Sequence, residues 1–358
     1  MDLHVNRTDL HRTQVVDRPA EALEPGQARL RIERFGLSAN NITYAVIGDM
    51  LHYWDFFPAD EGWGRVPVWG YATVVESRHE GVATGTRVFG FLPMSDELVI
   101  TVGRVDARSI TDAAPHRSPM AAAYNRYTLA PPGGEGGSAA EDQRMLLYPL
   151  FFTSFLVDDF LADNGWFGAT VLVLSSASSK TALGVAHRVA KRVGVEVVGL
   201  TSAGNVGFTT GLGVYDRVLA YDQADALPPG PAVYVDVSGS AAVRTSVHRH
   251  YGTDLRHDMI LGGTHWDEMD AGAGDLVGPT PTFFFAPDQV AKRSQEWGAE
   301  VLDRSFEEAW SRFAPWAGGW MTFQHGAGPD AIGRTYLELL DNRADPTVGH
   351  IVSPSADS

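Results

Sequence analysis

Residues 169–201 read ATVLVLSSASSKTALGVAHRVAKRVGVEVVGLT, and this stretch decides the fold. It begins with a continuously apolar, β-branched run at Ala169–Leu174, which is typical of a strand buried on both faces of a parallel sheet. A helix is expected over Ser179–Val193, followed by a second buried strand over Val195–Leu200. The stretch therefore predicts a strand–helix–strand unit of a doubly wound sheet.

The chain after this unit keeps the same alternation. Strands separated by helices and short loops indicate an α/β fold of the Rossmann type, with a doubly wound parallel sheet. The further strands are expected at Arg217–Ala220, Ala232–Val237, Asp258–Leu261 and Thr282–Phe285.

The segments at the two ends of the chain have a different character. Alternating runs at Ala28–Glu33, Tyr71–Glu76 and Thr86–Leu92, with Gly and Pro between them and no long amphipathic helix before about Phe151, predict a small β-barrel-like domain. The Gly-rich stretch Pro131–Glu141 is expected to be a flexible surface loop. The tail predicts a strand, a helix and a closing strand at Trp320–His325, Asp330–Asp341 and His350–Val352.

Composition limits the function classes. A length of 358 residues suits two domains, and a formal net charge of −16 argues against nucleic acid as a partner. The chain has no cysteine, which excludes disulfides and cysteine-ligated zinc. It begins without the pattern of a secretory signal and shows no run of the length that a membrane helix needs, so a cytoplasmic location without membrane contact is expected.

The turn after the first buried strand is the candidate phosphate site, because a helix N-terminus there presents N–H groups to a pyrophosphate. The glycine fingerprint G-x-G-x-x-G is absent, but small hydroxyl side chains and one lysine still suit a phosphate. The alternative is that the serines only cap a helix. A phosphate loop of the G-x-x-x-x-G-K-[ST] kind is disfavoured, because Leu174 and Ser179 occupy its glycine positions. The candidate cofactor-binding residues of this turn are Ser176, Ser178, Ser179, Lys180 and Thr181.

The end of the second strand indicates which dinucleotide would bind. NAD enzymes usually place an acidic residue there, whereas this chain has Thr201, Ser202 and Asn205. Since no acid would repel a 2′-phosphate, NADP(H) is favoured as the cofactor. A plain turn of small polar residues is the alternative.

Several segments together resemble the quinone- and enoyl-reductase branch of the medium-chain dehydrogenase/reductase superfamily. These are ARLRIERFGLSANNITYAVIGD (28–49), GVATGTRVFGF (81–91), LLYPLFFTSFLVDDFL (146–161), the strand–helix–strand unit quoted above and ADPTVGHIV (344–352). The YNRY run at 124–127, together with PLFFTS and SSASSKT, is similar to a divergent bacterial subgroup catalogued as a domain of unknown function.

The resemblance implies a domain organisation and several roles. A GroES-like, β-barrel-type domain would span residues 1–130 and be completed by residues 315–358, and a Rossmann-type nucleotide-binding domain would span residues 145–314. Thr153 would be the threonine beside the nicotinamide, and the protein would be a homodimer. Zinc-free reductases of this kind need a proton donor, and Tyr53 lies where enoyl reductases carry a tyrosine. Tyr44, Tyr124 and Asn125 are secondary candidates, with ordinary packing as the alternative for all four.

Histidines and aromatic residues allow two further interpretations. No metal site is expected, since cysteine is absent, and His248 and His250 are interpreted as part of a solvated helix end. The aromatic run His52–Phe57, with Trp63 and Trp69, would either line a pocket for an apolar or planar small-molecule substrate or form domain core.

Three functional hypotheses follow from these observations. The first is a zinc-independent, NADPH-dependent reductase of an activated C=C or C=O bond, such as an enone, enoyl thioester or quinone. The second is a non-redox, lyase-like enzyme or a pseudoenzyme on the same fold, with a degenerate dinucleotide site. The third is a regulatory or interaction protein that uses a bound nucleotide only as a structural element.

Overall fold

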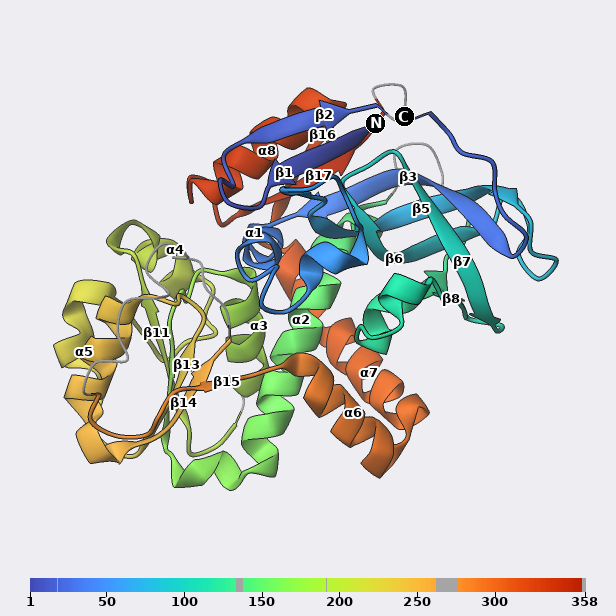
Figure 1. The fold of residues 1–358 in the computed structure, drawn as a ribbon. Helices are drawn as coiled ribbons and strands as arrows, with labels where there is room; N and C mark the ends of the chain where they lie inside the picture. Colours follow the sequence, from blue (N-terminus) through green and yellow to red (C-terminus); the bar gives the residue numbers. More distant parts are fainter. Residues whose placement is uncertain (18, 133–137, 191, 262–275, 356–358) are drawn as a thin grey trace. The chain divides into compact units, whose positions relative to one another are not determined.

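The computed structural model describes residues 1–17, 19–132, 138–190, 192–261 and 276–355 (Figure 1). The chain divides into two compact units. Unit 1 consists of Met1–Leu146 and Met321–Ser358, and unit 2 consists of Leu147–Trp320. Each unit is described by itself below.

Unit 2 is built on a parallel sheet whose strand order is β12-β11-β10-β13-β14-β15. The chain starts this sheet at β10, proceeds outward through β11 and β12, and then returns to the other side of β10 for β13. That reversal makes the pair β10 and β13 the topological switch point, and it confirms the Rossmann-type sheet. The strands are β10 (Val171–Leu174), β11 (Glu196–Thr201), β12 (Arg217–Ala220), β13 (Ala232–Asp236), β14 (Leu255–Ile260) and β15 (Thr282–Phe283).

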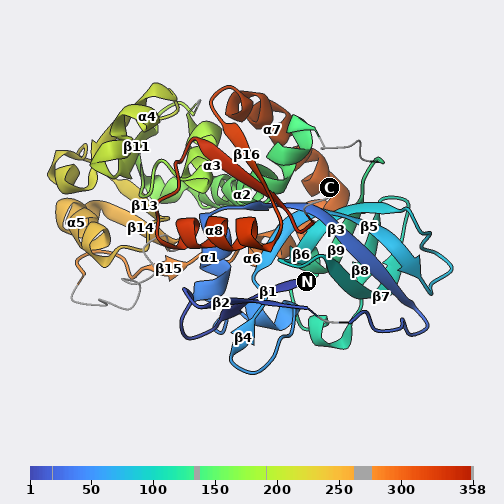
Figure 2. The ribbon, with the colours of Figure 1, turned by 90° about the horizontal axis from the view of Figure 1, so that it is seen from above.

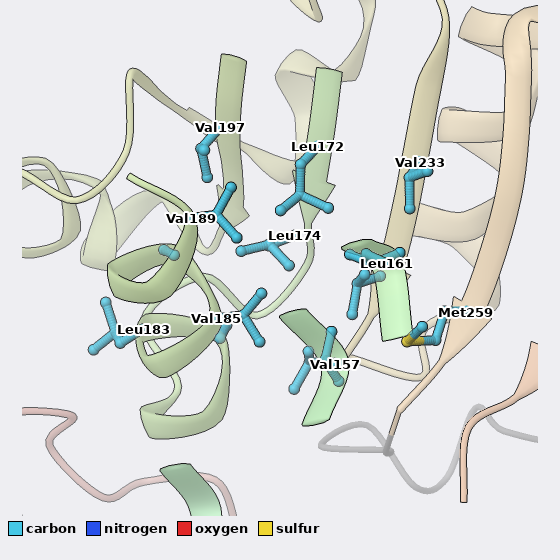
Figure 3. Packing of buried hydrophobic residues seen from close by; sticks show 14 of the residues in the cluster. Val157, Leu161, Leu172, Leu174, Leu183, Val185, Val189, Val197, Val233 and Met259 are labelled. Carbon is cyan, nitrogen blue, oxygen red and sulfur yellow. The ribbon is translucent and has the colours of Figure 1, made fainter. Parts of the chain in front are cut away.

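Helices cover both faces of this sheet. One face, with Leu172 and Leu174, packs against α2 and α3 through side chains such as Val157 and Val185 (Figure 3). The alternate residues of the same strands, such as Val173, pack on the other face against α5. Since both faces are buried, the strands read as continuous apolar runs. The helices with residues in unit 2 are α2 (Ala139–Asp163), α3 (Lys180–Val189), α4 (Val206–Gly211), α5 (Ala241–Tyr251), α6 (Ala286–Trp297) and α7 (Ala299–Gly318).

The start of α2 corrects one expectation from the sequence. The flexible loop was expected to continue to Glu141, but α2 already begins at Ala139, because Ala and Glu are good helix formers. Residues 133–137 of that predicted loop lie outside the described residues.

A second correction also concerns α2. By length and composition alone this helix could cross a membrane, contrary to the expectation that no such run exists. Of its most apolar window, 61% is buried inside the structure. This test is weak evidence, because a buried core helix passes it equally well.

Unit 1 contains a closed barrel. Its strands pair in the order β3-β5-β6-β9-β8-β7, and β7 pairs back to β3, which closes the ring. Figure 2 shows these strands gathered around one another. The closing strand of the chain, β17, pairs antiparallel with β3, so segments from both ends of the sequence share one sheet. This confirms the split GroES-like, β-barrel-type fold.

The residue ranges of the strands and helices of unit 1 are as follows. The barrel strands are β3 (Gln27–Leu37), β5 (Pro67–Ser77), β6 (Arg87–Pro93), β7 (Glu97–Val105), β8 (Ser109–Asp112) and β9 (Arg126–Leu129). The other strands are β1 (Asp2–Asn6), β2 (Thr13–Val16), β4 (Trp63–Gly64), β16 (Thr322–Ala327) and β17 (Val348–Ser353). The helices are α1 (Ala39–Val46), α8 (Pro329–Leu340) and the short 3-10 turns η1 (Tyr53–Phe56), η2 (Pro115–Arg117) and η3 (Ala122–Asn125).

Candidate functional site

The serine turn, Ser175–Ser179, connects β10 to α3 at the carboxyl edge of the sheet. Ser179 is the N-cap of α3, and its hydroxyl accepts a hydrogen bond from the Ala182 N–H over 3.3 Å. Ligands of open α/β sheets bind at this edge and at this switch point. The turn therefore stands where a dinucleotide phosphate would be held.

Ser176 has a backbone conformation that is typical of glycine. Its φ is +50°, in the left-handed region that favours glycine and that other residues adopt only at a cost. The Ser176 N–H donates to the Tyr221 hydroxyl over 3.2 Å, and this bond helps to hold the unusual conformation. The turn thus keeps a tight, glycine-like course although its sequence lacks the fingerprint.

Ser175 and Asp236 fix the turn to the neighbouring strand. The Ser175 hydroxyl donates to Asp236 Oδ1 over 2.8 Å, and it accepts hydrogen bonds from the N–H groups of Val237 and Ser238 over 2.9 and 3.0 Å. Asp236 Oδ1 also accepts from the Gly239 N–H over 3.0 Å. Since Ser175 and Asp236 are both fully buried, these bonds are made without competition from water.

Two buried ion pairs continue this network. Arg244 on α5 donates to Asp236 Oδ2 over 2.7 Å. His248, also on α5, bonds through Nε2 to Asp258 Oδ2 over 2.7 Å and through Nδ1 to the Val277 carbonyl oxygen over 2.9 Å. The expectation of a solvated helix end is wrong for His248, whose side chain is 1% exposed. Its burial is possible because both ring nitrogens find partners.

A small polar cluster forms where β11 ends. The hydroxyls of Ser178 and Thr201 lie 3.2 Å apart, and the Asn205 amide donates to the Ser178 hydroxyl over 3.1 Å. Thr201 is buried, whereas Ser202 is exposed. Three of the predicted cofactor residues are therefore bonded to one another, and Ser202 faces solvent beside them.

The other predicted residues of the nucleotide site lie on helices. Lys180 and Thr181 open α3, both half-buried. Thr153 lies on α2, where its hydroxyl donates to the Pro149 carbonyl oxygen over 3.3 Å.

The helices α2 and α3 approach each other closely, which was not predicted from the sequence. A Cβ at Gly184 would lie 2.4 Å from the Ser154 hydroxyl oxygen, so only glycine fits there. Ser154 in turn donates to the Thr181 carbonyl oxygen over 2.8 Å. A glycine in the middle of an expected helix is the signal that could have indicated this approach.

The predicted tyrosines come together in unit 1. The hydroxyl oxygens of Tyr53 and Tyr124 are 3.3 Å apart, and the ring centroids of Tyr44 and Tyr53 are 4.5 Å apart. Burial raises the pKa of each of the three tyrosines. All three hydroxyls are therefore protonated at neutral pH, which is the state a proton donor needs.

Arg117 organises this tyrosine cluster, although no sequence pattern indicates it. Its fully buried guanidinium pairs with Asp112 over 3.0 Å and donates to the Tyr124 carbonyl oxygen over 2.7 Å. It also bonds the side chain of Asn125 over 3.0 Å, and the Asn125 amide donates back to the Arg117 carbonyl oxygen over 2.9 Å. The Asn125 side chain is therefore fully engaged in hydrogen bonds to Arg117, which stabilise the segment between the two residues.

The aromatic run 52–57 divides between core and surface. Tyr53, Phe56 and Phe57 are buried against Phe91 and its neighbours, as one of the two alternatives had it. His52 and Asp55 instead line a cavity together with Trp63, and Trp54, which is itself buried, borders the same cavity.

No cluster of three or more His, Cys, Asp or Glu side chains that could hold a metal ion occurs within the described residues.

The fold is similar to that of several solved reductases. One is the quinone oxidoreductase of Pseudomonas syringae pv. tomato DC3000, with a TM-score of 0.61, 13% identity and coverage of 99% of each chain. Another is CurA from Vibrio vulnificus in complex with NADPH, with a TM-score of 0.59, 13% identity and coverage of 96% of this chain and 93% of that one. A third is the 2-enoyl thioester reductase Etr1p/Etr2p heterodimer of Candida tropicalis, with a TM-score of 0.57, 11% identity and coverage of 98% of each chain.

Sequence comparison gives the family. The family model described as "Protein of unknown function (DUF2855)" matches residues 35–345, so the chain belongs to that family. No curated protein matches the chain in sequence. The family is thus a divergent one with the fold of the quinone and enoyl reductases.

Proposed function

We propose that the chain is a zinc-independent, NADPH-dependent reductase of an activated C=C or C=O bond, of the enone, enoyl thioester or quinone type. The observation that carries the proposal is the serine turn at the switch point of a Rossmann-type sheet. Dinucleotides bind at this point of such sheets, with their pyrophosphate at the helix N-terminus.

The residues of the turn fit the phosphates of NADP(H). Ser176 allows a close approach by its glycine-like backbone, and Lys180 adds a positive charge at the first residue of α3. The carboxylate nearest the turn, Asp236, is neutralised by Arg244. At the end of β11, the exposed Ser202 offers a hydroxyl and no carboxylate stands beside it, which suits a 2′-phosphate, whereas the Thr201 hydroxyl is buried against Ser178.

When bound, the cofactor supplies a hydride, and the chain must supply a proton. In the proposal the Tyr53 hydroxyl donates that proton and regains one from the Tyr124 hydroxyl, 3.3 Å away, and Tyr124 in turn regains a proton from solvent water. Arg117 holds the Tyr124 backbone in place. Both tyrosines are neutral at physiological pH, as a proton donor must be, and the raised pKa that burial gives them makes them weaker acids than an exposed tyrosine.

The substrate in this proposal is a small apolar or planar molecule, and the protein acts as a cytoplasmic homodimer. For the substrate, the support is that the similar structures include a quinone oxidoreductase and a 2-enoyl thioester reductase.

One observation favours a second candidate, a pseudoenzyme or non-redox enzyme with a degenerate site. The backbone N–H groups of Ser175, Ser176, Ala177 and Ser179 all donate to acceptors within unit 2. A phosphate would therefore depend on the remaining N–H groups and on side chains.

The experiment is a fluorescence titration of the protein with NADPH and, separately, with NADH. Tighter binding of NADPH is expected. A Ser202→Asp variant places an acid at the end of β11 and should weaken NADPH about tenfold while leaving NADH unchanged, with Ser311→Asp on the exposed face of α7 as the matched control. Binding of neither nucleotide would contradict the reductase and support the pseudoenzyme.

If NADPH binds, its oxidation is then followed with an enone, a quinone and an enoyl thioester in turn. Oxidation by one of these classes is expected. Binding without oxidation by any of them would favour a structural role for the nucleotide.

A further inference from the structure

Unit 1 contains a cavity of about 530 Å³ that the proposed reaction does not use. It is lined by His52 and Trp54 beside η1, by Trp63 of β4, and by His116, Pro119 and Met120 of the segment around η2. Cavities that bind small molecules typically have volumes of about 300–1,000 Å³ and mostly apolar walls with a few polar groups. This cavity has both properties.

The cavity is distinct from the tyrosine cluster. The residues of η1 divide between two sides: Trp54 and Asp55 line the cavity, while Tyr53 and Phe56 are buried against Tyr124. The cavity and the candidate proton donors therefore lie on different sides of the same turn.

The Trp54 wall is rigid. A Cβ at Gly48 would lie 2.3 Å from Trp54 Nε1, and a Cβ at Gly64 would lie 2.2 Å from Trp54 Cε3. Neither glycine has a positive φ, so these positions need glycine for the space that the indole fills rather than for an unusual backbone. Because Trp54 is only 3% exposed, it supports the cavity from behind, and a support held in this way requires little ordering when a molecule binds.

The hydrogen bonds of the two histidines fix which polar groups they offer. His52 Nδ1 lies 2.9 Å from Asp55 Oδ2, and His116 Nε2 lies 3.3 Å from the Phe56 carbonyl oxygen. Both partners only accept, so these nitrogens carry the hydrogens. In the neutral rings, His52 Nε2 and His116 Nδ1 are then acceptors, and a ligand must supply hydroxyl or N–H donors.

We propose that this cavity binds a hydroxylated aromatic molecule of one or two rings, such as a phenol, with its ring against the apolar wall of Trp63, Pro119 and Met120 and its hydroxyl donating to His52 or His116. A guanidinium at the rim, that of Arg7, lies 5.8 Å from the centroid of the Trp54 ring and favours the electron-rich ring of such a ligand. The site is independent of the nucleotide turn.

The test is calorimetric titration of the full-length protein at pH 8 with 2-naphthol and with 2-methoxynaphthalene, which has the same ring system but no donor. Saturable binding of one 2-naphthol is expected, about fivefold tighter than the methoxy compound, since one hydrogen bond is lost. His52→Phe and His116→Phe should remove this preference in part, each lowering 2-naphthol affinity about two- to fivefold. His79→Phe, in the turn after β5, is the control and should change nothing.

Ala59→Trp gives a second test that leaves both histidines in place. Ala59 lines the cavity, so the larger side chain should fill it and abolish 2-naphthol binding. NADPH binding is measured on the same variant and should be unchanged. No binding of 2-naphthol, equal binding of both compounds, or an equal effect of His79→Phe would overturn the proposal, and none of these results would bear on the nucleotide turn.

Discussion

The Ser175 hydroxyl donates a hydrogen bond of 2.8 Å to Asp236 Oδ1, and this bond joins residues 61 positions apart in the sequence. The two residues end the adjacent strands β10 and β13, which border the switch point. Hydrogen bonds between side chains thus stabilise the tight turn that, in other Rossmann-type domains, the glycines of the G-x-G-x-x-G fingerprint allow. The Arg244 guanidinium compensates the buried charge of Asp236.

The first prediction concerns Ser175. Ser175→Ala removes the acceptor of the Val237 and Ser238 N–H groups and one donor to Asp236, all of them buried. We expect a loss of about 1–3 kcal/mol in the free energy of unfolding, measured by urea denaturation. Ser311→Ala, an exposed serine on α7, should change stability by less than about 0.5 kcal/mol. Equal effects of the two variants would show that the Ser175 network is energetically unimportant.

The second prediction concerns Lys180, the first residue of α3. If its ammonium contacts a phosphate of NADPH, Lys180→Ala should weaken NADPH binding about 10- to 100-fold, because a hydrogen bond to a charged group contributes about 1.5–3 kcal/mol. Lys292→Ala removes a lysine from α6 that pairs with Asp163, and it should leave the dissociation constant unchanged. An unchanged constant for Lys180→Ala would place this lysine outside the phosphate site.

The third prediction concerns pH. Burial lowers the pKa of His248, but the hydrogen bonds to Asp258 and the Val277 carbonyl outweigh it and raise the pKa above its usual value of 6.5. Between pH 6.5 and that higher value the folded state retains a proton that the unfolded state has lost, so stability falls as pH rises.

This slope is measured by urea denaturation at a series of pH values. His248→Gln should flatten it, because glutamine does not titrate in this range. His250→Gln, on the same helix, is the control and should leave the slope as in the wild type. A slope that persists in His248→Gln would assign the titration to another group.

The fourth prediction concerns the packing of α3 on α2. Gly184→Ala places a methyl group 2.4 Å from the Ser154 hydroxyl oxygen, which is itself tied to the Thr181 carbonyl. We expect a loss of about 1–3 kcal/mol, measured as a lower melting temperature. Adding Ser154→Gly should restore part of it. Gly333→Ala, in α8 with open space around it, should instead stabilise the protein slightly, and a loss there would mean that crowding does not explain the Gly184 result.

The sheet of unit 2 could be predicted because its strands are buried on both faces. The predicted strands Ala169–Leu174 and Val195–Leu200 match β10 and β11 to within two residues. A short, continuously apolar run is typical of a strand that is buried on both faces. By contrast, α6 and α7 are absent from the sequence prediction. Their apolar residues recur at helical spacing, but many polar residues separate them, and the prediction followed the apolar strands instead.

The candidate sites could be predicted only in part. The serine turn and the tyrosines stand at sequence positions that local patterns or resemblance indicate. The positions of their partners are not indicated by any local pattern. Asp236, Arg244 and Arg117 come close to the turn and to the tyrosines only in the folded chain. Arg117 is a clear case, since arginine is almost never fully buried unless it is paired, and its partner Asp112 cannot be recognised from the sequence alone.

The last prediction concerns Tyr53. If its hydroxyl protonates the substrate, Tyr53→Phe should lower turnover by about 10²- to 10⁴-fold, the usual contribution of a positioned acid. The dissociation constant of NADPH should not change, because the lost hydroxyl bonds only Tyr124 among the interactions described for unit 1. If Tyr53 serves packing alone, turnover should stay near normal with a small loss of stability from one hydrogen bond.

A matched control separates these outcomes. Tyr336 is equally buried in unit 1, and its hydroxyl has no hydrogen-bond partner within the described residues, so Tyr336→Phe should preserve turnover, cofactor affinity and stability. Single-turnover hydride transfer, NADPH affinity and melting temperature are measured on both variants. A collapse of NADPH binding in Tyr53→Phe, or an equal loss of turnover in Tyr336→Phe, would refute the assigned role. Because burial raises the pKa of Tyr53, the wild-type rate should also show no loss from tyrosine ionisation up to pH 10, the usual tyrosine value.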